Sequence, residues 1–322
     1  MQDDFGRTIN YLRLSITDRC NLRCRYCMPA EGIRQGSRQD ILSYEDCLKI
    51  VTAATDLGVS KVRITGGEPL VRKGVVAFLA ELANRPGIED VALTTNGVLL
   101  ASMAAELKNA GVKRLNVSLD SLQEKTFARM TRGGSLTSVL KGLERAEAVG
   151  LKIKLNMVVM RGFNDHEVLD FAELSQEHPW SIRYIEYMPT IREPGWREQL
   201  VSGAEVLSQL REKYSLSAIT RDVSCGPAQP YRIAGAPGTI GVITPISDHF
   251  CGSCNRIRVT STGQAKSCLF SHEAIDLKPY LSADNEKLRQ VLEEVITRKP
   301  ARHEMLGIES TNAPFSMAHI GG

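Results

Sequence analysis

The sequence predicts an α/β protein whose core is an open (βα)6 partial barrel of the TIM type, followed by a smaller α+β C-terminal appendage. Two observations lead to this prediction. Between residues 10 and 188, short β-branched runs alternate with amphipathic helical stretches, a pattern typical of parallel strands joined by right-handed crossovers. Polar motifs then follow the ends of the predicted strands, where such barrels bind ligands. Six units are too few for a closed eight-stranded barrel, so we expect an open one.

The elements follow from hydrophobic periodicity and from their flanking turn residues. The predicted core strands are Tyr11–Ile16, Lys61–Thr65, Asp90–Thr94, Arg114–Leu119, Lys152–Val159 and Arg183–Tyr187. Capping boxes are predicted at Ser43–Asp46, Ser121–Glu124 and Asn164–Glu167. Further along, we expect helices near Ser202–Lys213 and Glu286–Arg298, and strands at Tyr231–Ala234, Thr239–Thr244 and Arg256–Val259. We therefore divide the chain into a core, residues 1–190, and a C-terminal region, residues 191–322.

The composition is that of a soluble enzyme. The 322 residues are 43% hydrophobic and 24% charged, enough to bury a sizeable core. The net charge of +3 is too small to indicate a nucleic-acid-binding protein. No apolar run is long enough to span a bilayer, and the acidic start of the chain is unlike a cleavable signal. We therefore expect a cytoplasmic protein without nucleic-acid or membrane partners, in which grouped cysteines bind metal rather than form disulfides.

Three closely spaced cysteines, Cys20, Cys24 and Cys27, are the most informative motif of the core. A four-iron cluster held by cysteine normally takes four thiolates, so a loop that supplies three leaves one iron without a protein ligand. An open coordination site of this kind is where metal chemistry takes place. A zinc knuckle is the alternative for this triplet taken alone. Tyr26 adds an aromatic ring that could stack on an adenine.

A second triplet, Cys251, Cys254 and Cys268, lies in the C-terminal region. Together with His272 its spacing also suits a Cys3His zinc site, and the triplet alone leaves zinc and iron–sulfur open. Arg256 and Arg258 alternate on one face of a predicted strand beside it, as a phosphate clamp would require. The sequence contains no P-loop motif, so a nucleoside triphosphate would have to be held by such arginines.

Further motifs follow the predicted strands, namely Gly66-Gly-Glu-Pro69, Thr94-Thr-Asn-Gly97, Ser118-Leu-Asp120 and Glu186-Tyr-Met-Pro189. The first cysteine triplet combined with the Gly-Gly-Glu-Pro run resembles the radical S-adenosylmethionine (SAM) superfamily. Two triplets, the Cys-Asn-Arg-Ile-Arg run of residues 254–258 and the terminal Gly321-Gly322 are similar to one family within it, MoaA, the GTP 3',8-cyclases of molybdenum cofactor biosynthesis. The resemblance covers nearly the whole chain.

The resemblance implies two [4Fe-4S] clusters and SAM as cofactors, with GTP as substrate. Cys20, Cys24 and Cys27 would hold the SAM-binding cluster, and Cys251, Cys254 and Cys268 the substrate-binding cluster. The residues implied for SAM are Tyr26, Gly67, Ser118 and Met188. Those implied for GTP are Arg13, Arg63, Thr94, Lys154, Arg256, Ile257 and Arg258. Gly321 and Gly322 would reach into the site and take part in catalysis.

The implied reaction begins when a 5'-deoxyadenosyl radical takes hydrogen from ribose C3' of GTP. Attack on guanine C8 then gives 3',8-cyclo-7,8-dihydro-GTP, which MoaC converts further. The resemblance also implies a flavodoxin- or ferredoxin-type electron donor, and a homodimer is compatible with it. Two alternatives remain open. A peptide-modifying maturase with an auxiliary cluster usually carries more C-terminal cysteines. A zinc module that binds RNA needs interleaved aromatic residues, and only 6% of residues are aromatic.

Overall fold

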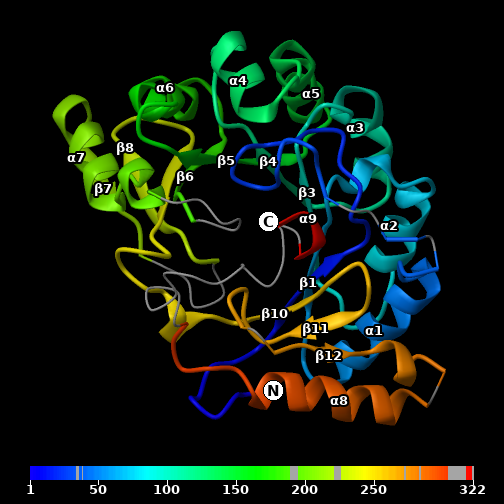
Figure 1. The fold of residues 1–322 in the computed structure, drawn as a ribbon. Coiled ribbons are helices and arrows are strands. Elements are labelled where there is room, and N and C mark those ends of the chain that lie inside the picture. The colour runs from blue at the N-terminus through cyan, green and yellow to red at the C-terminus, as the bar shows by residue number, and fades with distance from the viewer. Residues whose placement is uncertain are drawn as a thin grey trace.

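A computed structural model of the chain describes residues 1–33, 36–37, 39–188, 195–220, 226–271, 273–282, 284–303 and 317–320. Its strands form one sheet in the order β12-β11-β10-β1-β2-β3-β4-β5-β6-β9-β8-β7. The sheet curves around a central space, and the helices α1 to α6 lie on its outside (Figure 1). The predicted α/β fold with an open, largely parallel sheet is therefore confirmed.

The core strands lie close to their predicted positions. They are β1 (Tyr11–Ser15), β2 (Lys61–Thr65), β3 (Asp90–Thr95), β4 (Arg114–Ser118), β5 (Lys152–Val159) and β6 (Ser181–Glu186), and each pairs in parallel with the next. The helices between them are α1 (Tyr44–Asp56), α2 (Val75–Ala83), α3 (Leu100–Asn109), α4 (Glu124–Thr131), α5 (Leu136–Ala148) and α6 (Val168–Glu177). Short 3-10 helices are η1 (Pro69–Val71) and η2 (Asp165–Glu167).

The C-terminal region extends the same sheet from both of its edges. Its strands are β7 (Leu216–Ala218), β8 (Gln229–Ile233), β9 (Thr239–Ile243), β10 (Arg256–Val259), β11 (Gln264–Lys266) and β12 (Ile275–Asp276). Strand β9 pairs in parallel with β6, and β10 pairs in parallel with β1. Its helices are α7 (Gly203–Lys213), α8 (Asn285–Thr297), α9 (Met317–Ile320), η3 (Trp196–Gln199), η4 (Cys251–Ser253) and η5 (Lys278–Tyr280).

The loop of residues 244–255 joins β9 to β10 and therefore crosses the open side of the barrel. This loop carries Cys251 and Cys254, so the predicted second metal centre lies where the sheet fails to close. The division into residues 1–190 and 191–322 stays a prediction, since the sheet is continuous across it.

The two faces of the core strands differ in chemistry because side chains alternate along a strand. Outward-facing residues such as Leu12, Val62 and Ile257 join the apolar core beneath the helices. Cys47 of α1 lies in this core with no exposed surface, as its helical spacing predicts. The intervening residues Arg13 and Arg63 line the space inside the barrel. The sequence thus places apolar groups under the helices and cations inside.

One of the three predicted capping boxes is confirmed. The Ser43 hydroxyl accepts a hydrogen bond from the Asp46 amide, and the Asp46 carboxylate accepts from the Ser43 amide. The prediction at Ser121 is wrong, because its hydroxyl donates to the distant Glu167 and α4 begins without a side-chain cap. The prediction at Asn164 is also wrong, because its side chain donates to the Asp120 and Val158 carbonyls.

A close approach at Gly238 fixes the start of β9 beside α6. A Cβ atom at this position would lie 2.4 Å from the Trp180 carbonyl oxygen and 2.7 Å from the Ser175 oxygen. Both are backbone atoms, so a side chain cannot be accommodated by a rotamer change. We expect Gly238→Ala to destabilise the fold by about 1–3 kcal/mol, measured as a lower urea midpoint of unfolding. Gly226→Ala is the control, since no atom of the described residues lies within 4 Å of its Cβ position. Equal midpoints for the two variants would contradict this account.

Candidate active site

A cavity of about 190 Å³ lies inside the barrel, between the inner faces of the strands and the two cysteine-bearing segments. Most of the predicted site residues line it. They are Arg13, Tyr26, Arg63, Thr94, Ser118, Met188, Cys251, Cys254, Arg256, Arg258 and Cys268. The structure therefore brings together, around one space, residues that lie far apart in the sequence.

The first cysteine loop is anchored to α4. The amides of Arg23 and Arg25 donate to the carbonyls of Thr131 and Met130, at 3.0 and 2.9 Å. Burial raises the pKa of Cys24 well above its ordinary value, and Asp120, Cys27 and Cys20 raise it further. The three thiols are therefore close enough to influence one another. Their set of soft sulfur donors suits an iron–sulfur cluster or zinc, and binding a cation would relieve this clustering of negative charge.

Gly66 and Gly67 serve the packing of the first cysteine loop. The Gly67 amide donates to the Thr17 carbonyl at 2.7 Å, and a Cβ at Gly67 would lie 2.4 Å from the Arg19 carbonyl oxygen. The glycines thus allow residues 17–19, which lead into Cys20, to lie against the end of β2. Nearby, Glu68 accepts from three donors of the chain itself, and burial raises its pKa to about 7.

Tyr26 connects the first cysteine loop to the cavity. Its hydroxyl donates to Asp120 Oδ2 at 2.8 Å, and Asp120 Oδ1 accepts from the Val158 amide at 2.9 Å. Burial raises the pKa of Asp120 to about 6. Because the ring is held from its hydroxyl end, one side of Tyr26 faces the cavity in a fixed orientation.

The predicted arginines Arg13, Arg63, Arg256 and Arg258 converge on the cavity, and Arg183 of β6 lines it as well. Arg13 pairs in register with Arg63 on one side and with Arg258 on the other. Burial and the neighbouring charges lower the pKa of Arg13 well below its ordinary value, and they lower the pKa of Arg258 to about 10. Like charges gathered in a buried cavity favour an anionic ligand.

The Nε of Arg13 and the Oγ1 of Thr94, on residues that line this cavity, are buried without a hydrogen-bond partner in the described part of the chain. A buried donor without a partner costs stability, so native sites usually hold such groups for a ligand. The unsatisfied atoms and the clustered cations point to the same kind of ligand, one with several anionic oxygens.

The second cysteine triplet lies in positively charged surroundings. Arg256 Nη2 donates to Cys254 Sγ at 3.4 Å. Although burial alone would raise the pKa of Cys254, the charges of Arg256 and Lys299 lower it to about 6. Cys254 is therefore ready to bind a metal as a thiolate. Within the described residues, one ring nitrogen each of His249 and His303 and the Sγ of Cys251 lie within 4.8 Å of one another, close enough to share a metal ion. These two rings already bond to each other at 2.9 Å.

Some predicted site residues lie elsewhere. Gly67 contacts the first cysteine loop, and the side chain of Ile257 packs in the apolar core with 1% exposure. Lys154 lies on the inner face of β5, two residues before Asn156, which does line the cavity. Gly321, Gly322 and His272 lie outside the described residues.

The sequence analysis missed several cavity residues. Arg183 of β6 alternates with core residues just as Arg13 does, so the period of the strand could have identified it. Glu186 belongs to the motif expected after the sixth strand but was given no role there. Its carboxylate accepts hydrogen bonds from the amides of Gly203, Ile246 and Ser247 and fixes the start of the loop 244–255. Met317 of α9 also lines the cavity, and no local pattern indicates this. In Figure 1, α9 lies inside the ring of strands.

In the described part of the chain, no helix has the length and apolar character needed to cross a membrane.

Comparisons with known proteins agree with this site. A family model described as the radical SAM superfamily matches residues 14–175, and one described as molybdenum cofactor synthesis C matches residues 180–305. The chain is 54% identical to a GTP 3',8-cyclase of Geobacter sulfurreducens over 99% of both chains. It is 46% identical to the Alkaliphilus metalliredigens enzyme of the same name and 45% to that of Moorella thermoacetica, over 100% of each chain. A solved structure of Streptococcus suis SuiB shares the fold, with a TM-score of 0.58 and 16% identity over 86% of this chain and 62% of SuiB.

The opposite pKa shifts of Cys24 in the first triplet and Cys254 in the second can be tested in metal-free, reduced protein. At pH 7 we expect iodoacetamide to alkylate Cys254 much faster than Cys24, because a thiol with a pKa near 6 is mostly ionised there and a thiol with a raised pKa is not. The rate at Cys254 should fall as the pH drops below about 6, and peptide mass spectrometry measures both sites. A Cys254 rate that still rises steeply between pH 7 and 9 would contradict the assigned environment. Arg256→Gln should move the midpoint of this curve to higher pH.

Proposed function

The chain belongs to the GTP 3',8-cyclase family of the radical SAM superfamily, and from this membership we propose which of its residues carry each part of the reaction. It is a radical SAM enzyme of molybdenum cofactor biosynthesis, with SAM and iron–sulfur clusters as cofactors and GTP as substrate. The expected product is 3',8-cyclo-7,8-dihydro-GTP. A peptide-modifying maturase is not favoured, because the relatives that match the chain over its full length are GTP cyclases.

We assign Cys20, Cys24 and Cys27 to a [4Fe-4S] cluster that binds SAM. When bound, the cluster and SAM would supply 5'-deoxyadenosyl radical chemistry to a substrate in the cavity, and the residues of the chain would hold and orient the ribose of GTP for it. Tyr26, Ser118 and Met188 face the cavity beside this loop and would bind SAM. Gly67 would act through the packing of residues 17–19, which sets the position of Cys20.

The cations of the cavity would hold the triphosphate of GTP. The observation that supports this most directly is the pair of buried, unsatisfied atoms, Arg13 Nε and Thr94 Oγ1. Arg63, Arg256 and Arg258 add charge around the same space, and Lys154 and the main chain of Ile257 complete the proposed set. Guanidinium groups suit this task because each offers several donors in a fixed plane.

Cys251, Cys254 and Cys268 would hold a second [4Fe-4S] cluster that contacts the guanine. Their loop crosses the open side of the barrel, so the substrate would lie between the two clusters. GTP would then be fixed at both ends, with its base at the second cluster and its phosphates on the arginines. Such positioning brings one ribose carbon next to the radical and keeps solvent away from it.

The end of the chain would complete the site. Met317 lines the cavity and Ile320 is 2% exposed, so the segment before Gly321 and Gly322 lies inside the barrel. We propose that these two glycines enter the cavity and take part in catalysis. We also infer a cytoplasmic enzyme that receives electrons from a flavodoxin- or ferredoxin-type donor and passes its product to MoaC. A homodimer is compatible with these assignments.

The two clusters should respond differently to loss of a ligand. Cys24→Ala should abolish reductive cleavage of SAM, whereas Cys254→Ala should still form 5'-deoxyadenosine but no cyclic product. Anaerobically reconstituted wild-type protein should bind about eight irons, and each variant about four. Chromatography of 5'-deoxyadenosine and of the GTP product, with iron analysis, measures these outcomes. Equal loss of SAM cleavage in both variants would refute this division, and wild-type protein that binds zinc alone would refute the cluster assignment.

The arginine cluster makes a paired prediction about binding and stability. Arg13→Met should weaken GTP binding by about 2–4 kcal/mol, since it removes one buried charge from the phosphate site. The same change should raise the unfolding midpoint of the GTP-free protein, because it relieves repulsion from Arg63, Arg256 and Arg258. Calorimetric titration and urea unfolding measure the two effects. The control Arg211→Met, on the exposed face of α7, should change neither. Lower stability together with unchanged affinity would show that Arg13 serves the fold alone.

A further inference from the structure

A small hairpin at the start of the chain carries a buried ion pair. Gln2 and Thr8 form an antiparallel bridge, and Asp3 Oδ1 accepts from the amides of Phe5 and Arg7 at 3.0 and 2.9 Å. Arg7 Nε lies 2.5 Å from Asp3 Oδ2, and the two side chains are 5% and 0% exposed. The Asp3 carboxylate balances the charge of Arg7. The remaining N–H groups of this buried guanidinium still require hydrogen-bond acceptors.

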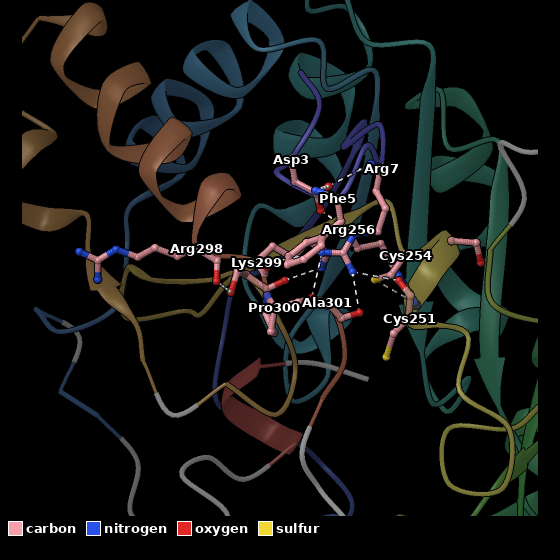
Figure 2. Close-up of polar contacts among 12 residues, drawn as sticks. Asp3, Phe5, Arg7, Cys251, Cys254, Arg256, Arg298, Lys299, Pro300 and Ala301 are labelled. Atoms are coloured by element: carbon pink, nitrogen blue, oxygen red, sulfur yellow. Dashed lines mark hydrogen bonds and ion pairs between the residues drawn. The ribbon is translucent and has the colours of Figure 1, made fainter.

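Main-chain carbonyls from two distant segments supply those acceptors. Arg7 Nη1 donates to the Cys251 oxygen at 3.0 Å and to the Ala301 oxygen at 3.3 Å. Its Nη2 donates to the oxygens of Pro300 at 2.9 Å and Lys299 at 3.3 Å. Figure 2 shows the Arg7 side chain between the Cys251 loop and the segment that follows α8. One side chain therefore ties the second cysteine loop to residues 299–301.

Lys299 extends these contacts to the other two cysteines. Its Nζ donates to the Arg256 oxygen at 2.8 Å and to the Ser267 oxygen at 2.6 Å. Ser267 directly precedes Cys268, and Arg256 donates to Cys254 Sγ. The path from Asp3 through Arg7 and Lys299 thus reaches Cys251, the neighbour of Cys254 and the residue before Cys268. Figure 2 shows the part of this path around Cys251 and Cys254.

We propose that Arg7 is a positioning residue of the second cluster: held by Asp3, it fixes the Cys251 main chain against residues 299–301. This inference rests on the proposed assignment of Cys251, Cys254 and Cys268 to that cluster. The three ligands come from two segments, 251–254 and 268, and a cluster requires a constant spacing between them. Residues 299–301 also begin the part of the chain that leads to α9 in the cavity, so the same contacts fix where that part starts. Lysine cannot replace Arg7, because a point charge cannot reach both pairs of carbonyls.

The test measures the second cluster by itself. In a Cys24→Ala background the first cluster is absent, and iron release to an excess of a ferrous chelator then reports on the second cluster alone. We expect Arg7→Gln to speed this release about tenfold to a hundredfold, the usual effect of losing an outer contact of a metal site. In a Cys254→Ala background, which keeps the first cluster, the same change should leave release within about twofold, because the described hydrogen bonds of the Arg7 guanidinium go to Asp3, the second cysteine loop and residues 299–301, and none goes to residues 20–27. Optical spectra follow both reactions anaerobically.

Three further variants separate positioning from general stability. In the double variant Asp3→Asn/Arg7→Gln, no carboxylate is left without its partner, and the asparagine side chain at position 3 can still accept from the amides of residues 5 and 7. This variant should release iron as fast as Arg7→Gln alone. Arg7→Lys keeps the charge and the fold but should still release iron faster than wild type. Arg161→Gln removes an exposed arginine whose described partners are Glu205 and the Leu200 carbonyl rather than a cysteine loop, and it should match wild type.

The opposite results would overturn the inference. Wild-type release rates in the double variant would mean that Arg7 only neutralises Asp3, and wild-type rates in Arg7→Lys would mean that charge alone suffices. Equal acceleration in both cysteine backgrounds would mean that Arg7 supports the fold as a whole. Failure of the cluster assignment itself would look different, because Cys254→Ala would then keep the full iron content of wild type.

Discussion

The gathering of like charges inside the barrel is the constraint on which the rest of the structure depends. Arg13, Arg63, Arg256 and Arg258 face one space, and their repulsion together with burial lowers the pKa of Arg13. They stay together because the residues between them in sequence pack under the outer helices, where each Å² of buried apolar surface contributes about 25 cal/mol. Because side chains alternate along each strand, burial of the apolar residues in the core forces the arginines to face the cavity, where their charges repel one another. That cavity becomes favourable only when an anion fills it.

The two cysteine triplets show how the same donor atoms can be placed in opposite electrostatic settings. Around Cys24, burial and the Asp120 carboxylate favour the neutral thiol, so only a bound cation makes the ionised loop favourable. Around Cys254, Arg256 and Lys299 stabilise the thiolate before any metal arrives. The positively charged surroundings of Cys254 adjoin the cationic cavity, because Arg256 both donates to Cys254 Sγ and lines the cavity. The proposed sites of the polyanionic substrate and of the second metal centre therefore share one source of positive charge, whereas the proposed first centre lies in another electrostatic setting.

Local patterns in the sequence predicted most of the fold and the position of the cavity. Alternation along the predicted strand placed Arg256 and Arg258 on one face, and both line the cavity, whereas Arg13 and Arg63 were expected at the site only from the family resemblance. The same alternation would have placed Ile257 in the core. Ser43 formed its capping box because both partners lie in one turn. Ser121 and Asn164 did not, because tertiary partners took their hydrogen bonds. The roles of Arg7 and Lys299 could not be predicted, since their acceptors lie far away along the chain and are backbone carbonyls without a residue signature.

The pairing of β10 with β1 also determines the order in which the molecule can be assembled. A ribosome makes β1 to β6 long before residues 256–259, and N-terminal parts of a chain begin to fold first. Until β10 arrives, the edge of β1 is bare and the side of the barrel next to it is open. The segment that carries Cys20, Cys24 and Cys27 is therefore synthesised while this side of the barrel is still open. The second triplet exists only once the barrel is nearly complete, so the two proposed metal centres are completed at different stages of synthesis.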